Sequence, residues 1–197
     1  MNEIPTYATH YHVRNREPFL NLSDLSDGEL FQVMEQLDVE RLQGDSKRIF
    51  GSRYIDLRKK TETKLRALFV AAGGKPQRAA PHYFVLGTSN WFKNLSPQMQ
   101  EVRIALSELP SAQTTFTYPD SFTAMAIGPE YGLPYESKPY HERVFRLEEL
   151  SEVVRLYGTP RDEVTSQYHN YHKQIFEKYV EIQLWSDEPL RDFQEHG

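Results

Sequence analysis

The sequence of 197 residues contains no cysteine, which excludes disulfide bonds, thiolate nucleophiles and zinc sites built on Cys ligands. It also has no run that approaches the roughly 18 consecutive apolar residues of a membrane span. The first five residues, MNEIP, lack the basic and apolar regions of a secretory signal peptide. We therefore expect a cytoplasmic protein in which any catalysis uses groups other than thiols.

The sequence does have the apolar and aromatic residues that a folded domain needs. Hydrophobic residues make up 39% of the chain and aromatic residues 13%, which is typical of a protein with a buried core rather than of a disordered chain. We predict a single α+β domain over residues 1–197, with a mixed or antiparallel β core and flanking helices. Residues 19–78 are expected to be mainly helical and basic, and residues 79–197 to form a β-rich core with two late helices.

Positive charge is concentrated in one segment of an acidic protein. The chain has a net charge of −5, yet ten Lys or Arg residues lie between Lys47 and Arg78, with only Asp56 and Glu62 to balance them. Such a segment fits a surface for nucleic acid or phosphate groups, or a solvated helix face that forms ion pairs with the acidic remainder. Both interpretations stay open, and the first predicts nucleic acid as a partner.

Five helices are predicted, and one of them is a short helix that is capped within Thr88-Ser89-Asn90 and carries Trp91 and Phe92. Ser26 and Glu29 have the spacing of a capping box, which starts a helix, and Gly44 suits the left-handed conformation that ends one. The apolar face of this helix is expected to be buried and consists of Leu30, Val33, Met34 and Leu37. A second helix is expected over residues 52–72, and two later ones over residues 147–157 and 159–176.

Six strands are predicted from alternating or continuous apolar residues, over residues 7–13, 81–87, 102–106, 114–118, 141–146 and 179–185. Pro119 ends the fourth of them, so Asp120 and Ser121 follow a strand end, where functional residues often lie. Residues 126–140 contain three prolines and three tyrosines. A loop of this length and composition predicts an ordered lid over a binding site.

Two pairs of histidines have spacings that suit metal binding. His10 and His12 project to one face of the first predicted strand, and His169 and His172 lie one turn apart on the last predicted helix. Each pair lacks a third ligand within its own element, and a polar strand face is the commoner explanation of the first pair. A metal-dependent hydrolase therefore stays an alternative, although we expect no metal.

Glu181 is the main candidate for a functional residue, because it interrupts an apolar strand. Side chains alternate along a strand, so a second set of residues shares the face of Glu181, namely Tyr179, Gln183 and Trp185. An exposed sheet surface would accommodate this set. In the alternative interpretation the set binds a nucleotide: the rings stack on it, while Glu181 accepts hydrogen bonds from ribose hydroxyls and stabilises a developing positive charge.

The stretch YVEIQLW around Glu181, followed by Pro189 and Leu190, resembles the last core strand of ADP-ribosyltransferase-fold proteins, a family that includes DNA-modifying toxins. In that family a Glu on a late strand is the central catalytic residue. The resemblance implies transfer of ADP-ribose from NAD, with Glu181 in the catalytic role. It also implies that Tyr118 or Tyr83 stacks on NAD and that His10 or His82 contacts its adenosine. Together with Gln183, these residues form the predicted NAD-binding set.

Two alternatives from other classes stand beside this transferase hypothesis. One is a non-catalytic module that binds a partner through its Tyr-rich loop and leaves Glu181 exposed. The other is the metal-dependent hydrolase built on the His pairs. A cleft that contains Glu181, Tyr118 and a His from an early strand would favour transfer, whereas Glu181 on an open convex face would argue against it.

Overall fold

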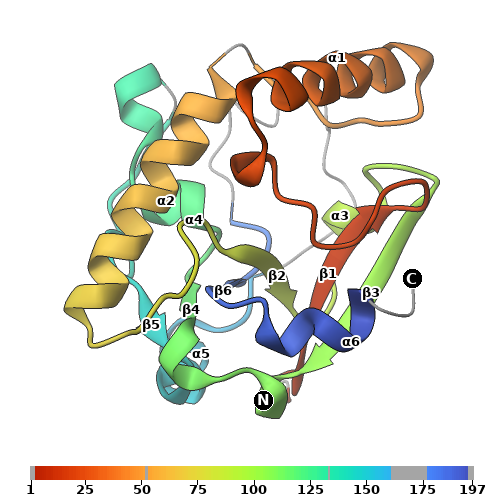
Figure 1. Ribbon diagram of the computed structural model, residues 1–197. Helices are drawn as coiled ribbons and strands as arrows, with labels where there is room; N and C mark the ends of the chain where they lie inside the picture. The colour runs from red at the N-terminus through yellow and green to blue at the C-terminus, as the bar shows by residue number, and fades with distance from the viewer. Residues whose placement is uncertain (1–2, 52, 133, 161–176, 195–197) are drawn as a thin grey trace.

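The computed structural model describes residues 3–51, 53–132, 134–160 and 177–194. One sheet runs through the centre of the fold (Figure 1), and its strands are β1 (Tyr7–Val13), β2 (His82–Leu86), β3 (Met99–Ala105), β4 (Thr114–Thr117), β5 (Phe145–Arg146) and β6 (Glu181–Leu184). The helices are α1 (Asp27–Gln43), α2 (Tyr54–Ala71), α3 (Asn90–Lys93), α4 (Ser121–Ala124), α5 (Leu150–Tyr157) and α6 (Arg191–Gln194). Short 3-10 turns lie at Leu22–Asp24, Leu106–Glu108, Ser111–Gln113, Gly128–Tyr131, Leu147–Glu149 and Glu188–Leu190.

The six strands form one open sheet in the order β3-β1-β2-β6-β4-β5, and every neighbouring pair is antiparallel. The last strand of the chain, β6, lies between β2 and β4, so it is hydrogen-bonded along both edges. All four residues of β6 are buried, although Glu181 and Gln183 alternate with Ile182 and Leu184. The predicted α+β class with an antiparallel core is confirmed.

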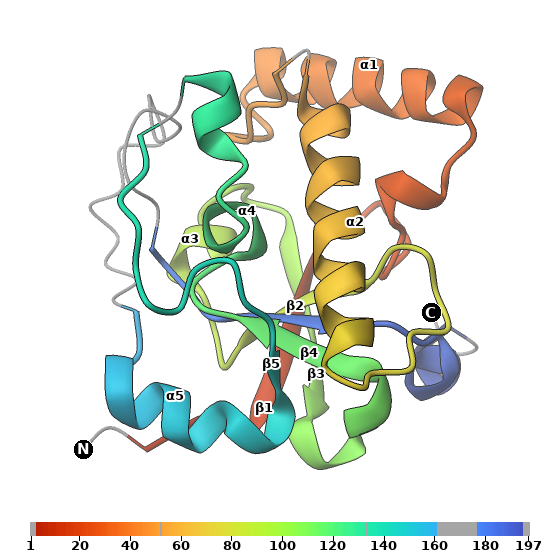
Figure 2. The same ribbon diagram turned by 90° about the vertical axis from the view of Figure 1, so that its left-hand side faces the viewer.

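Two apolar clusters cover the two faces of the sheet. Ile182 and Leu184 of β6 belong to the larger cluster, together with Val153 and Val154 of α5. Trp185 lies in the second cluster, against Leu65 and Phe69 of α2 and residues that follow β4. Figure 2 shows α2 and α5 on opposite sides of the sheet. The face under α2 is the one that carries Glu181, because Glu181 alternates with Ile182.

The first helix begins and ends as predicted. The Ser26 hydroxyl accepts from the Glu29 amide, the Glu29 carboxylate accepts from the Ser26 amide, and Gly44 has φ +84°. Burial differs from the prediction, because of the four expected apolar residues only Leu37 is buried and the other three are half-buried. The helix does not lie flat on the sheet, and Phe31 is 64% exposed.

In the second half of the chain one predicted strand needs correction, and one predicted helix lies mostly outside the described residues. The strand expected over residues 141–146 is reduced to the two residues of β5, because Glu142 adopts φ +57° and its amide donates to Ala124 O at 2.6 Å instead of to a strand. The helix over residues 147–157 is confirmed and ends at Gly158, whose φ is +79°. Of the helix predicted over 159–176, residues 161–176 lie outside the described part of the chain. None of the helices described combines the length and apolar character that membrane crossing requires.

Candidate functional site

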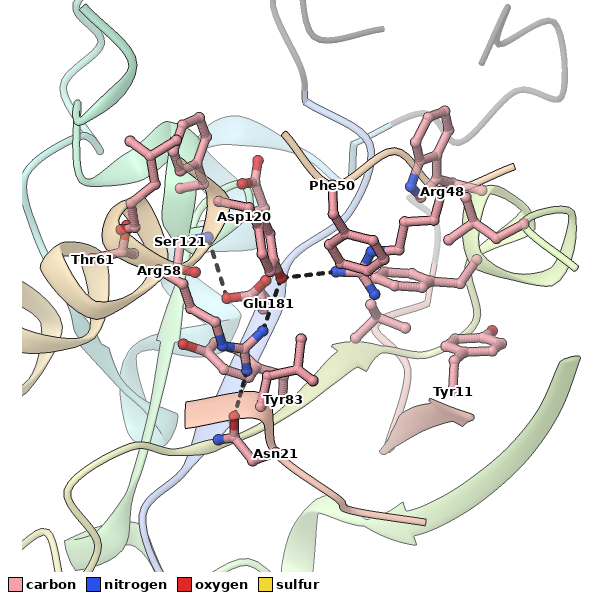
Figure 3. A pocket seen from close by; sticks show the side chains of 18 of the residues that line it. Tyr11, Asn21, Arg48, Phe50, Arg58, Thr61, Tyr83, Asp120, Ser121 and Glu181 are labelled. Carbon is pink, nitrogen blue, oxygen red and sulfur yellow. Dashed lines mark hydrogen bonds between the residues drawn. The ribbon is translucent and has the colours of Figure 1, made fainter. Parts of the chain in front are cut away.

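A cleft of 710 Å³ lies on the α2 side of the sheet. Its lining includes Glu181 from β6, Tyr83 from β2 and Arg58 from α2, and residues from α1, α4 and the 128–141 loop complete it. Figure 3 shows how these side chains surround Glu181, with Asp120 and Ser121 on one side and Arg58 and Tyr83 on the other. Segments that are far apart in the sequence therefore meet over the middle of the sheet.

Glu181 is buried at the floor of this cleft, with 9% of its surface exposed. Its Oε1 accepts hydrogen bonds from the Ser121 amide at 3.3 Å and from Gln183 Nε2 at 3.1 Å. Gln183 is itself fixed, because it also donates to Thr117 Oγ1 and accepts from Thr115 Oγ1. Within the described residues no hydrogen bond is made to the second oxygen of Glu181. The exposed-surface interpretation of Glu181 is wrong, since Glu181, Gln183 and Trp185 are all buried.

A second carboxylate, Asp120, lies beside Glu181. The register pairs Thr117 of β4 with Glu181, and three residues later Asp120 caps α4 by accepting from the Thr123 amide at 3.1 Å. The pKa of Glu181 is raised to about 7, first by burial and second by the charge of Asp120, while the hydrogen bonds from Ser121 and Gln183 act in the opposite direction. Burial likewise raises the pKa of Asp120 to about 6. Both carboxyl groups therefore titrate near neutral pH, as is typical of functional sites.

A buried arginine forms the wall opposite Asp120. Arg58 donates through Nε to Glu62 at 3.0 Å, through Nη1 to Tyr54 at 3.0 Å and through Nη2 to Asn21 at 2.8 Å. Its guanidinium also lies 4.7 Å from the centre of the Tyr83 ring, and the Tyr83 hydroxyl donates to Glu62 at 3.0 Å. These contacts hold the ring of Tyr83 in one orientation. The charge of Arg58 is largely compensated by Glu62, so it does not neutralise Glu181.

Aromatic rings and further arginines, among them Arg48, line the rest of the cleft. Tyr179 packs against Phe92 with ring centres 5.1 Å apart, and burial, followed by the charges of Asp120 and Glu181, raises its pKa well above the usual value. Arg48 donates to the Tyr54 hydroxyl at 3.2 Å and lies over the Phe50 ring at 4.8 Å. It forms no ion pair with a carboxylate in the described ranges. The site thus combines two carboxyl groups, several rings and a cation.

The predicted NAD-binding residues are only partly brought together. Tyr83 lines the cleft beside Glu181, and Gln183 lies buried beneath it as its hydrogen-bond donor. Tyr118 packs in the larger cluster on the other face of the sheet, and its hydroxyl donates to Tyr157 O at 3.0 Å. It is not among the residues that line the cleft. The arrangement named as favouring transfer, a cleft that joins Glu181 with Tyr118, is therefore not formed, and the cleft joins Glu181 with Tyr83 instead.

His10 and His82 border the cleft, but their rings pack on Phe19, on the sheet face opposite Glu181. Both nitrogens of His10 are used within the protein, because Nε2 accepts from the Phe19 amide at 3.0 Å and Nδ1 lies 2.9 Å from Tyr83 O. Burial lowers the pKa of His10 to about 4. His82 Nε2 lies 2.7 Å from Asp187. The ring of His10 therefore has a structural role.

The His pairs do not meet in a described metal site. His10 and His12 stack with ring centres 6.3 Å apart, and His12 Nδ1 lies 3.0 Å from Arg16 O. Among the residues whose positions are described, no three His, Asp or Glu side chains form a group that could hold a metal ion. His169 and His172 lie outside those residues.

No similar protein was found. A scan against protein-family models and searches of curated proteins and of solved structures returned no match to this chain. The site is therefore interpreted from its own geometry.

Sequence reasoning missed Arg58 and Glu62, which it treated only as part of the charged segment between Lys47 and Arg78. A signal for them was present: Tyr54, Arg58 and Glu62 follow one another at four-residue spacing and continue into the buried residues Leu65 and Phe69. Charged residues of opposite sign at this spacing, in line with a buried stripe, indicate a buried ion pair. Asp120 was noted at a strand end, but its proximity to Glu181 depends on the pairing of β4 with β6.

Proposed function

We propose that the protein is an enzyme that transfers the ADP-ribosyl group of NAD to an acceptor, with Glu181 as its catalytic carboxylate. The observation that carries this proposal is the buried position of Glu181 on the cleft floor, where Ser121 and Gln183 fix one of its oxygens. A carboxylate that is oriented before substrate binds is suited to stabilise positive charge at a ribose C1′ atom. The resemblance of the strand around Glu181 to ADP-ribosyltransferase-fold proteins points to the same reaction.

The cleft has the dimensions and residue types that NAD requires. Its volume of 710 Å³ falls within the roughly 300–1,000 Å³ of small-molecule sites. The ring of Tyr83, held by Arg58 and Glu62, offers a flat surface for the nicotinamide ring. Arg48, which pairs with no carboxylate in the ranges described, is suited to bind the pyrophosphate. Asp120 Oδ2, which has no hydrogen-bond partner in the part of the chain that is described, adds a buried acceptor at the same floor.

Glu181 must be ionised to act in this way. Its pKa of about 7 in the free protein means that a substantial fraction is protonated at neutral pH. A positively charged nicotinamide ring close to Glu181 favours the ionised form and lowers this pKa. The carboxylate then accepts a hydrogen bond from a ribose hydroxyl and stabilises the charge that develops as nicotinamide leaves.

The first test is thermal unfolding with and without millimolar NAD. A ligand present at about 100 times its Kd adds about 2.7 kcal/mol to the free energy of unfolding. In a chain of this size each kcal/mol raises the thermal unfolding midpoint by about 2–4 °C, so NAD should raise it by roughly 5–11 °C. The wild type and Glu152→Gln, a matched change on the far side of the sheet, should both show this rise. Glu181→Gln should lose most of it without a lower midpoint in the absence of NAD, because a buried ionisable group has been replaced by a neutral one.

Release of nicotinamide, measured by chromatography, separates catalysis from binding. The wild type and Glu152→Gln should release it, and Glu181→Gln should not. Absence of both a midpoint shift and nicotinamide release in the wild type would contradict the proposal and favour the non-catalytic binding module.

Nucleic acid as the acceptor remains a proposal that rests on the basic segment between Lys47 and Arg78. Several of its cations have partners: Lys60 pairs with Glu130 and Lys64 with Glu142, at 2.8 and 2.7 Å. These pairs favour the interpretation as a solvated face that exchanges ion pairs. Binding of a labelled oligonucleotide at low and high salt tests the acceptor, because contacts to phosphates weaken steeply with salt.

A further inference from the structure

Asp120 has one carboxylate oxygen that its structural role does not use. Oδ1 accepts from the Thr123 amide at 3.1 Å as the cap of α4. Oδ2 is buried and has no hydrogen-bond partner among the residues the structure describes, although Asp120 is only 5% exposed and lines the cleft. A buried oxygen without a donor is costly. Because Asp120 lines the cleft, this oxygen is placed to accept from a group that enters it.

His141 provides a second and independent observation at the same cleft. Its side chain is 7% exposed and lines the cleft, and neither ring nitrogen has a partner within the described ranges. The ring packs against Tyr135 and Tyr140, with centres 5.2 and 5.0 Å away. The next residue is attached to the end of α4, because the Glu142 amide donates to Ala124 O. The helix capped by Asp120 and the loop that carries His141 thus form one wall.

We propose that this wall is the acceptor subsite, in which Asp120 Oδ2 accepts the proton of an incoming hydroxyl or amide nucleophile and His141 hydrogen-bonds to that acceptor. The inference rests on the proposed function. A bond forms between the acceptor oxygen or nitrogen and ribose C1′ as the bond from C1′ to nicotinamide breaks. The electron pair of that bond leaves on nicotinamide, which becomes neutral, and the acceptor proton passes to Asp120.

The charges at the subsite define the class of acceptor. Asp120 and Glu181 place two acidic groups at the floor, and the charge of Arg58 is compensated by Glu62. Repulsion disfavours acceptors that are already anionic, such as carboxylates and phosphates. A neutral acceptor that must lose a proton matches a general base whose pKa, about 6, lies close to neutral pH. The acceptor class is therefore a neutral hydroxyl or amide.

The decisive variant is Asp120→Asn, with water and methanol as probe acceptors and NAD as donor. Asn caps a helix as well as Asp does, so the fold should be retained, and Asp120→Ser provides a second capping residue without the carboxylate. Loss of a general base should slow nicotinamide release by about 10²- to 10⁴-fold, while NAD still raises the unfolding midpoint. Sodium azide should restore release and yield an ADP-ribosyl azide, because azide has no proton to lose and the variant no longer carries the Asp120 carboxylate that would repel this anion. Asp56→Asn, an exposed change in the first turn of α2, should behave as the wild type.

The outcomes separate this inference from the proposed function. Release by Asp120→Asn within about threefold of the wild-type rate overturns the role of Asp120 and leaves the transferase proposal intact. Slow release that azide does not restore, in a variant that still binds NAD, also overturns it, because a structural defect would impair both nucleophiles. A wild type that neither binds NAD nor releases nicotinamide overturns the proposed function and this inference together.

Discussion

The buried ion pair between Arg58 and Glu62 offers a direct test of the cleft wall. Arg58 bonds to Glu62, Tyr54 and Asn21 at 2.8 to 3.0 Å. The side chains of Arg58 and Glu62 are 16% and 6% exposed, so water does not compensate either charge once its partner is removed. Arg58→Met keeps a long apolar side chain and removes the cation. The expected consequence is a Glu62 carboxylate that is buried without its partner.

The magnitude follows from this loss of compensation. Removal of one partner of a buried pair costs about 3–5 kcal/mol, because the remaining charge is left unpaired. In a chain of 150–250 residues a loss of 1 kcal/mol lowers the thermal unfolding midpoint by about 2–4 °C. The midpoint of Arg58→Met should therefore be lower than that of the wild type by roughly 6–20 °C. The double variant Arg58→Met with Glu62→Gln should be less destabilised than the sum of the two single variants, because no charge remains to be compensated.

Urea unfolding at neutral pH measures these free energies, with the slope m checked for constancy. Lys60→Met is the matched control on the same helix: Lys60 also forms an ion pair, with Glu130, but its side chain is 52% exposed. An exposed pair contributes about 0–1 kcal/mol. Equal losses in Arg58→Met and Lys60→Met, or a loss below about 1 kcal/mol in Arg58→Met, would refute the reasoning.

Two further predictions concern stability. Because the folded state raises the pKa of Glu181 from 4.5 to about 7, it retains a proton that the unfolded chain has lost, so wild-type stability should fall as pH rises through this window. In Glu181→Gln stability should fall less with pH but should still fall, since the pKa of the adjacent Asp120 is raised as well. Urea midpoints of the wild type and the variant across this pH range measure the two falls. An identical dependence on pH in the two proteins would contradict the raised pKa of Glu181. His141→Phe should stabilise the protein by about 1 kcal/mol, because it keeps the ring contacts and removes two buried nitrogens that have no partner among the residues described. A lower urea midpoint for this variant would show that the nitrogens are satisfied in solution.

Local features were predictable from the sequence alone, because each depends on residues a few positions apart. The capping box of Ser26 and Glu29, the end of α1 at Gly44 and the cap of α3 at Ser89 all lie where the residue types indicated. Strand alternation correctly placed Glu181 and Gln183 on one face. Of the site, this reasoning identified Glu181, whereas Tyr83 was named only through the resemblance and as an alternative to Tyr118.

Tertiary structure alone decided which of these faces meet. The pairing of Thr117 with Glu181 brings Asp120 beside Glu181 and turns Tyr118 to the opposite side of the sheet, and nothing in either strand specifies that register. Arg58 and Glu62 are charged residues of the kind usually found on protein surfaces, and they become buried only because α2 packs over β2. Burial and proximity determine both the pairing of charges and the pKa values of carboxyl groups, and in this protein both arise between segments that are distant in the sequence. The sequence by itself thus determined the elements and the candidate Glu181, while the long-range packing determined its chemical environment.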